Sequence, residues 1–170
     1  ITSNDTLPVE SISNDYFTDP YEFSGMSIVA SSKLPGKTEI ASFNRSEMTI
    51  VARIGTTAAE AAKKYLPKAD LRLFDDEGQA LQEVLNGRAA AMISSQPFPE
   101  FQSLKYPERL YLPLAGETFT KEPIGIALGK GDVDFLNFLN NWIRVRQADG
   151  WLQERYDYWF TTQDWQEQMQ

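Results

Sequence analysis

Short apolar runs alternate with longer periodic segments through the middle of the chain. An apolar run over residues 48–54 stops at Gly55, and residues 57–66 after it are rich in alanine. This pattern predicts a strand followed by a helix. The alternation continues with a strand at 71–74, a helix over 76–86 that ends before Gly87, and a strand at 89–93. The order strand, helix, strand, helix, strand predicts right-handed crossovers and a parallel sheet.

Further elements are predicted on either side of this central region. Apolar runs predict strands at 26–30, 110–114 and 124–128, and a glycine-rich turn follows at 129–131. Two helices are predicted at 133–148 and 151–159, where apolar residues recur near the helical period. Aromatic side chains at this density are typical of a core, and we expect them to be buried. The aromatic residues on these helices include Phe135, Phe138, Trp142, Tyr156 and Trp159, and the aliphatic Ile143 and Leu152 fall on the same apolar sides.

The turn at Gly55, Thr56 and Thr57 is the first candidate binding site. Thr57 is the expected N-cap of the helix, and Glu60 three residues later would complete a capping box. The turn would then present free backbone N–H groups, two hydroxyls and the positive end of a helix dipole. These features suit an anionic group such as a carboxylate. The alternative is that the threonines only cap the helix.

A second polar group follows the strand at 89–93. Ser94, Ser95 and Gln96 stand at the carboxyl end of this strand. Ligands of open parallel sheets gather at the carboxyl ends of the strands, where the Gly55–Thr57 turn is also expected. The alternative is a solvated loop, since prolines follow at 97 and 99.

Composition and charge exclude several classes of function. The 170 residues are 42% hydrophobic and 24% charged, which is ordinary for a globular protein. A net charge of −8 without a Lys/Arg cluster argues against nucleic acid as a partner. The absence of both cysteine and histidine excludes triad hydrolases and zinc enzymes. The acidic run at 75–77 could hold a calcium ion, but a helix N-terminus also favours acidic residues, so we assign no metal ion. We expect no cofactor.

Five segments in order along the chain resemble a known family. They are FTDPY at 17–21, IGTTAAEAAKKYLP at 54–67, ALQEVLNGRAAAMI at 80–93, EPIGIALGKGD at 122–132 and FLNFLNNWIRVRQADGWLQERYDYWF at 135–160. In sequence and spacing they are similar to the periplasmic solute-binding proteins of ABC transporters, in the extracellular family 3 group.

The resemblance implies an α/β fold like that of type 2 periplasmic binding proteins, in which two lobes close on a ligand by hinge bending. Residues 24–122 would form a complete lobe 2 with a parallel βαβ core. Residues 1–23 and 124–170 would be the remnant of lobe 1 with the C-terminal helices, its first part being absent or supplied by a second chain. The implied partners are a small-molecule ligand and the membrane permease of an ABC importer, and the implied location is periplasmic or extracytoplasmic.

Carrying the binding positions of the family over to this chain gives a mixed result. Thr56 and Thr57 match the hydroxyls that receive the ligand carboxylate. The arginine that grips this carboxylate aligns with Ser11, and the aspartate that holds the α-ammonium aligns with Ser95. Loss of both charges removes the contacts that define amino-acid recognition. We therefore expect a small polar or anionic solute, held by hydroxyls and backbone N–H groups. The resemblance also adds N-terminal positions to the candidate site: Asn4, Thr6 and Ser11.

Two other functions are compatible with the same resemblance. Cyclohexadienyl dehydratases share the scaffold and use a carboxylic acid in the cleft, but their catalytic glutamate aligns with Phe98 here. Glu100, two residues further on, could replace it only if the loop shifts. A periplasmic sensor module is the other alternative. We expect binding without catalysis.

Overall fold

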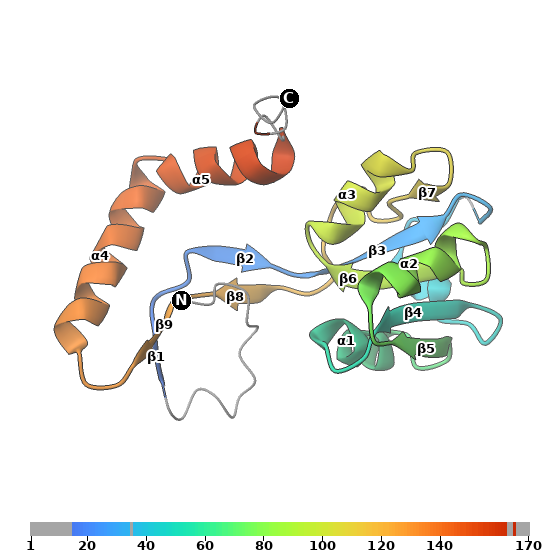
Figure 1. Ribbon diagram of the computed structural model, residues 1–170, viewed down its shortest axis with the longest axis horizontal. Helices are drawn as coiled ribbons and strands as arrows, with labels where there is room; N and C mark the ends of the chain where they lie inside the picture. Colours follow the sequence, from blue (N-terminus) through green and yellow to red (C-terminus); the bar gives the residue numbers. More distant parts are fainter. Residues whose placement is uncertain (1–14, 35, 163–164, 166–170) are drawn as a thin grey trace. The chain divides into compact units, whose positions relative to one another are not determined.

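The computed structural model describes residues 15–34, 36–162 and 165 (Figure 1). They divide into two units, one of residues 24–121 and the other of the remaining residues on both sides. Among the described residues, no helix combines the length and the apolar character needed to cross a membrane.

A five-stranded mixed sheet forms the centre of the unit of residues 24–121. Its strands are β3 (Met26–Ser31), β4 (Thr49–Arg53), β5 (Asp70–Phe74), β6 (Ala91–Ser95) and β7 (Leu110–Tyr111), in the order β5-β4-β6-β3-β7. β4 runs parallel to both β5 and β6, which confirms the predicted parallel core. β3 runs antiparallel to β6, and β7 pairs antiparallel with β3.

Helices cover both faces of this sheet (Figure 1). α1 (Thr57–Tyr65) packs on one face against Ile28, Ile50 and Ile93, and the short helix η2 (Ile40–Phe43) adds Phe43 to the same cluster. α2 (Glu77–Leu85) and α3 (Phe98–Lys105) belong to the opposite face. Because neighbouring residues of a strand point to opposite faces, β3, β4 and β6 supply both cores and are buried almost throughout. The sheet is therefore enclosed by two helical layers.

Some helix and strand boundaries in this unit agree with the capping and glycine signals in the sequence, and others differ from the prediction. α2 begins after its N-cap Asp76 and ends before Gly87, whose φ of 72° is the left-handed conformation expected there. The strand predicted at 110–114 stops at Tyr111. No element was predicted over α3, and Pro99 occupies its first turn, where a missing N–H costs no hydrogen bond.

The other unit contains two short ribbons and the C-terminal helices. β1 (Asp15–Phe17) pairs with β9 (Ala127–Gly129), and β2 (Glu22–Ser24) pairs with β8 (Glu122–Ile124). The single strand predicted at 124–128 is therefore two strands with different partners. α4 (Val133–Ala148) has the predicted bounds, whereas the second helix is α5 (Trp151–Tyr156) followed by the π-helical segment η3 (Asp157–Thr161).

The predicted burial of the C-terminal aromatic residues is wrong for most of them. Ile143 is the buried residue of α4, and α5 has none. The apolar side of a helix is buried only where another layer of secondary structure packs against it. Within the described residues of this unit, the two ribbons and two helices do not form such a layer. The side chains left between 38% and 61% exposed are Val133, Phe135, Phe138, Trp142, Val145, Trp151, Trp159 and Phe160.

Candidate functional site

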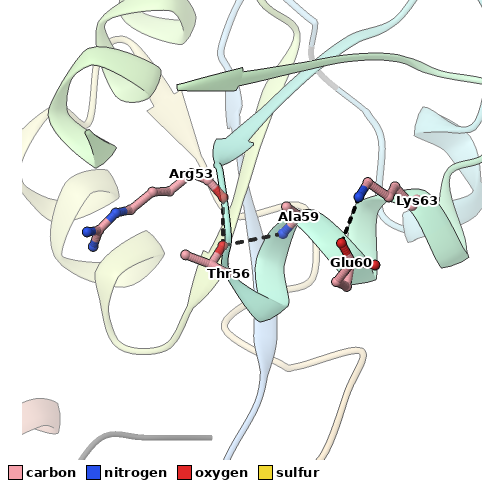
Figure 2. A network of polar contacts seen from close by, with 5 residues as sticks. All are labelled: Arg53, Thr56, Ala59, Glu60 and Lys63. Atoms are coloured by element: carbon pink, nitrogen blue, oxygen red, sulfur yellow. Dashed lines mark hydrogen bonds and ion pairs between the residues drawn. The ribbon is translucent and has the colours of Figure 1, made fainter. Parts of the chain in front are cut away.

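The turn between β4 and α1 forms the candidate site, and its cap lies one residue earlier than predicted. Thr56, not Thr57, is the N-cap: its hydroxyl oxygen accepts from the Ala59 N–H at 3.4 Å and donates to the Arg53 carbonyl at 2.7 Å (Figure 2). Gly55, with φ of 71°, reverses the chain early enough for Thr56 to take the extended conformation of a cap. Glu60 is then one position too far for a capping box, and it pairs instead with Lys63 at 2.7 Å.

Backbone N–H groups at this turn have no acceptor within the described part of the chain. They belong to four consecutive residues, Gly55, Thr56, Thr57 and Ala58. The first N–H groups of a helix have no partner inside the helix, and they carry its partial positive charge. The turn therefore offers several donors and an electrostatic preference for an anion.

Two hydroxyls at this edge of the sheet donate to no oxygen or nitrogen atom of the described residues. Thr57 is exposed, and its hydroxyl contacts the Met26 sulfur at 4.0 Å, which is a weak interaction. The exposed Ser95 hydroxyl makes no hydrogen bond to any described residue. Ser95 and Met26 are opposite one another in the β6–β3 pair, so their side chains lie on one face. That face is the one covered by α1, because Met26 belongs to the same cluster as the α1 alanines.

Ser94 and Gln96 are used inside the unit instead. Ser94 is buried, and its hydroxyl donates to the Glu77 carboxylate at 2.6 Å at the start of α2, on the opposite face from Ser95. The Gln96 side-chain amide donates to the Glu100 carboxylate at 3.1 Å and to the Gly116 carbonyl. The structure thus brings Gly55, Thr57 and Ser95 to one edge and face, but not these two side chains. The remaining candidates, Asn4, Thr6 and Ser11, lie outside the described residues.

Two charged residues near this edge were not chosen from the sequence as binding residues. Glu100 is partly buried in the first turn of α3, and this burial raises the pKa of its carboxyl above the usual range. The proline spacing at 97 and 99 was a usable signal for that helix start. Arg53 ends β4, is exposed, and has no ion-pair partner in the described chain, but its side chain extends away from α1 (Figure 2).

The chemistry available at the site is hydrogen-bond donation. Its free groups are backbone amides and two neutral hydroxyls, and among residues 15–34, 36–162 and 165 neither hydroxyl is hydrogen-bonded to a base that could make it a nucleophile. In the part of the chain that the structure describes, no group of three acidic side chains could hold a metal ion.

The curated proteins that resemble this chain are named as binding proteins. The L-cystine-binding protein TcyJ of Escherichia coli K12 is 28% identical over 144 residues, which are 85% of this chain and 53% of that protein. The chain therefore spans about half the length of the curated relatives it matches. No known protein-family profile matches it.

Solved structures match more of the chain. A protein described as a binding component of an ABC transporter from Wolinella succinogenes, complexed with lysine, has a TM-score of 0.81 and 34% identity over 95% of this chain and 69% of its own. An ancestral amino-acid-binding protein, described as a precursor of cyclohexadienyl dehydratase, has a TM-score of 0.71 and 32% identity over 91% of this chain and 65% of its own.

Proposed function

Because the chain belongs to the family 3 solute-binding proteins of ABC transporters, with their type 2 periplasmic-binding fold, we propose that it is the substrate-binding component of an ABC importer. It binds a small polar or anionic solute and performs no catalysis. The observation that carries the proposal is the set of free donors at one edge of the sheet, made of the N–H groups of residues 55–58 and the hydroxyls of Thr57 and Ser95.

The chemistry of this edge favours an oxyanion over an amino acid. The free backbone N–H groups described there can only donate, the hydroxyls of Thr57 and Ser95 can donate or accept, and a carboxylate or similar oxyanion offers acceptors for all of them. A bound α-ammonium would need an acceptor, preferably a charged one. Ser95 stands where the family has an aspartate for that purpose, and its hydroxyl is neutral. We therefore assign the ligand to the small organic acids or related oxyanions.

A dehydratase reaction needs a free acid, and the described site does not offer one. Phe98 occupies the position that corresponds to the catalytic glutamate. The Glu100 carboxylate accepts a hydrogen bond from Gln96, and a Cβ on Gly116 would lie 3.0 Å from it, so it is held within the unit. The raised pKa of Glu100 favours the enzymatic alternative, as does the likeness to a precursor of cyclohexadienyl dehydratase. Replacement of Glu100 by glutamine should leave ligand binding intact if the protein is only a binder.

Family membership also supports the organisation and partners that we propose. Residues 24–122 form lobe 2, and the described residues on either side belong to lobe 1. The apolar side of α4 and α5 is then a surface that further polypeptide of lobe 1 would cover. The protein acts outside the cytoplasm and delivers its ligand to a membrane permease.

A thermal-shift screen tests the proposed ligand class. Small carboxylates and other oxyanions should raise the melting temperature, and Thr57→Ala and Ser95→Ala should each reduce that shift. Thr38→Ala is the matched control, because Thr38 is exposed and makes no described hydrogen bond. Stabilisation by amino acids alone, with none from acids that lack an ammonium group, would overturn the proposal.

A further inference from the structure

A cavity of about 270 Å³ lies at the other end of the sheet from the candidate site. Three chain segments form it: the turn after β3, the residues that enter β4, and the connection from α2 to β6. The cavity residues that enter β4 and β6 are at the amino ends of these two parallel strands. Gly55 follows the carboxyl end of β4, and Ser95 is the last residue of β6. Five-residue strands at about 3.3 Å per residue separate the two places by roughly 15 Å. The cavity is therefore distinct from the donors of the β4–α1 turn.

The cavity wall carries two opposite charges that do not pair with each other. Lys33 and Glu47 both line it, and neither has an ion-pair partner among the described residues. The third charged residue of the wall, Arg88, is occupied: its Nε and Nη2 donate to the two oxygens of Glu83 at 2.9 Å and 2.6 Å. Lys33 and Glu47 thus leave one cation and one anion available at separate points of the same cavity.

Lys33 is not needed to cap the helix that it approaches. Its ammonium lies against Gly87 at the end of α2, where a Cβ on that glycine would be 2.8 Å from Nζ. A cation at a helix C-terminus usually satisfies the last carbonyl groups. Here the carbonyls of residues 82–85 already accept hydrogen bonds from Asn86, Gly87, Arg88, Ala89 and Arg109. The ammonium therefore remains available to a ligand.

The remaining wall is small and only partly apolar. Leu34, Met48, Ala89 and Ala90 contribute its apolar part, and Thr49, Gly87 and the buried Ser31 complete it. The volume is just below the range of about 300–1,000 Å³ typical of sites for drug-sized ligands, so it suits a smaller molecule.

From these features we propose that the cavity is a second binding site, for a small zwitterion. The ligand carboxylate pairs with Lys33, its ammonium pairs with Glu47, and its carbon chain lies over Met48 and Ala90. Both pairs are near the surface and contribute modestly, so the affinity is in the millimolar range. This chemistry is complementary to that of the β4–α1 turn, where the described free groups are donors.

A ¹⁵N NMR titration of the whole chain tests the proposal, because it reports the two sites at different amides. Glycine, β-alanine and 4-aminobutyrate vary the separation of the charges, and acetate and methylammonium each carry one charge. At least one zwitterion should shift the amides of Met48, Gly87 and Ala89, and should bind more tightly than acetate or methylammonium. Shifts at residues 55–58 report the other site and are read separately.

Variants of the two charged residues complete the test. Lys33→Ala and Glu47→Gln should each weaken zwitterion binding about five-fold. A double variant with Lys33→Glu and Glu47→Lys exchanges the two charges, so it should still bind the zwitterion, with the ligand's carboxylate and ammonium in exchanged positions. Lys68→Ala is the control, since this exposed lysine is outside the cavity wall. The proposal is overturned if none of the zwitterions shifts Gly87 and Ala89, if acetate binds as tightly as every zwitterion, or if Lys68→Ala weakens binding as much as Lys33→Ala.

Discussion

The two neighbouring threonines of the β4–α1 turn should separate stability from ligand binding. Thr56→Ala removes the cap of α1, whereas Thr57→Ala removes a hydroxyl whose one described contact is the Met26 sulfur at 4.0 Å. Thr56→Ala should therefore destabilise the protein and Thr57→Ala should not. The pair is well matched, because the same atoms are deleted at adjacent positions.

The magnitude follows from the hydrogen bonds of each hydroxyl. Loss of an N-cap threonine costs about 1 kcal/mol, within a range of about 0.5–2 kcal/mol. Thr56 also donates to the Arg53 carbonyl at 2.7 Å, and a partly exposed bond of this kind adds up to about 1 kcal/mol. We expect a loss of about 1.5 kcal/mol for Thr56→Ala, which lowers the Tm of a lobe of about 100 residues by roughly 6–12 °C. The change for Thr57→Ala should stay within about 0.5 kcal/mol.

Thermal unfolding followed by far-UV circular dichroism measures both variants, and amide hydrogen exchange in α1 shows whether the loss is local. Thr38→Ala again serves as the control. The reasoning is refuted if Thr57→Ala costs as much stability as Thr56→Ala, since Thr57 would then be the cap. With an oxyanion bound, the order should reverse: Thr57→Ala loses most of the ligand-induced shift, and Thr56→Ala keeps it whenever α1 stays folded.

Three further substitutions address other parts of the same lobe. Ser94→Ala breaks the buried bond to Glu77 and should cost about 1–3 kcal/mol in urea unfolding, with ligand affinity unchanged. Burial raises the pKa of Glu100, so the folded state binds the carboxyl proton more tightly than the unfolded state does. The stability that this gives is fully present at a pH below the ordinary pKa of 4.5, and it is lost as the pH rises through the pKa of the folded state. Glu100→Gln should therefore gain stability relative to the parent between pH 4 and pH 7, and a constant difference would contradict the assignment. Gly25→Ala places a Cβ against the Thr120 carbonyl oxygen and should cost more than about 3 kcal/mol. Its control is Gly129→Ala in the other unit, which should cost little because no described atom lies within 4 Å of the added Cβ.

The elements that sequence reasoning predicted well are those whose signals are local. β4, α1 and α2 each lie within a short window of the chain that contains its own apolar period and its own stop, such as Gly87 after α2. The antiparallel insertion of β3 between β6 and β7 depends on residues far apart in the chain, and no local pattern contains it. The exposure of Phe138 and Trp142 is likewise set by what packs over α4, which their own sequence does not determine.

Two of the errors in the predicted geometry of the candidate site are shifts of a single residue. Either of two adjacent threonines satisfies the sequence rule for a cap, and the φ of Gly55 decides between them. Ser94 and Ser95 were treated alike because the strand was predicted to end at residue 93. β6 continues to Ser95, so the alternation of the strand sends these two side chains to opposite faces.

The charge of the chain gives an oxyanion site of this kind an unusual dependence on salt. The 170 residues carry a net charge of −8, which repels an anion at long range, whereas the donors of residues 55–58 act at hydrogen-bond distance. Added salt screens interactions beyond a Debye length of about 8 Å at 0.15 M and leaves direct contacts largely intact. Affinity for a small carboxylate should therefore stay constant or rise by up to about two-fold between roughly 0.02 and 0.15 M NaCl, as measured by calorimetry. A steep fall would instead show that a cation supplies most of the binding energy, and Arg53, which ends β4, would be the first residue to replace.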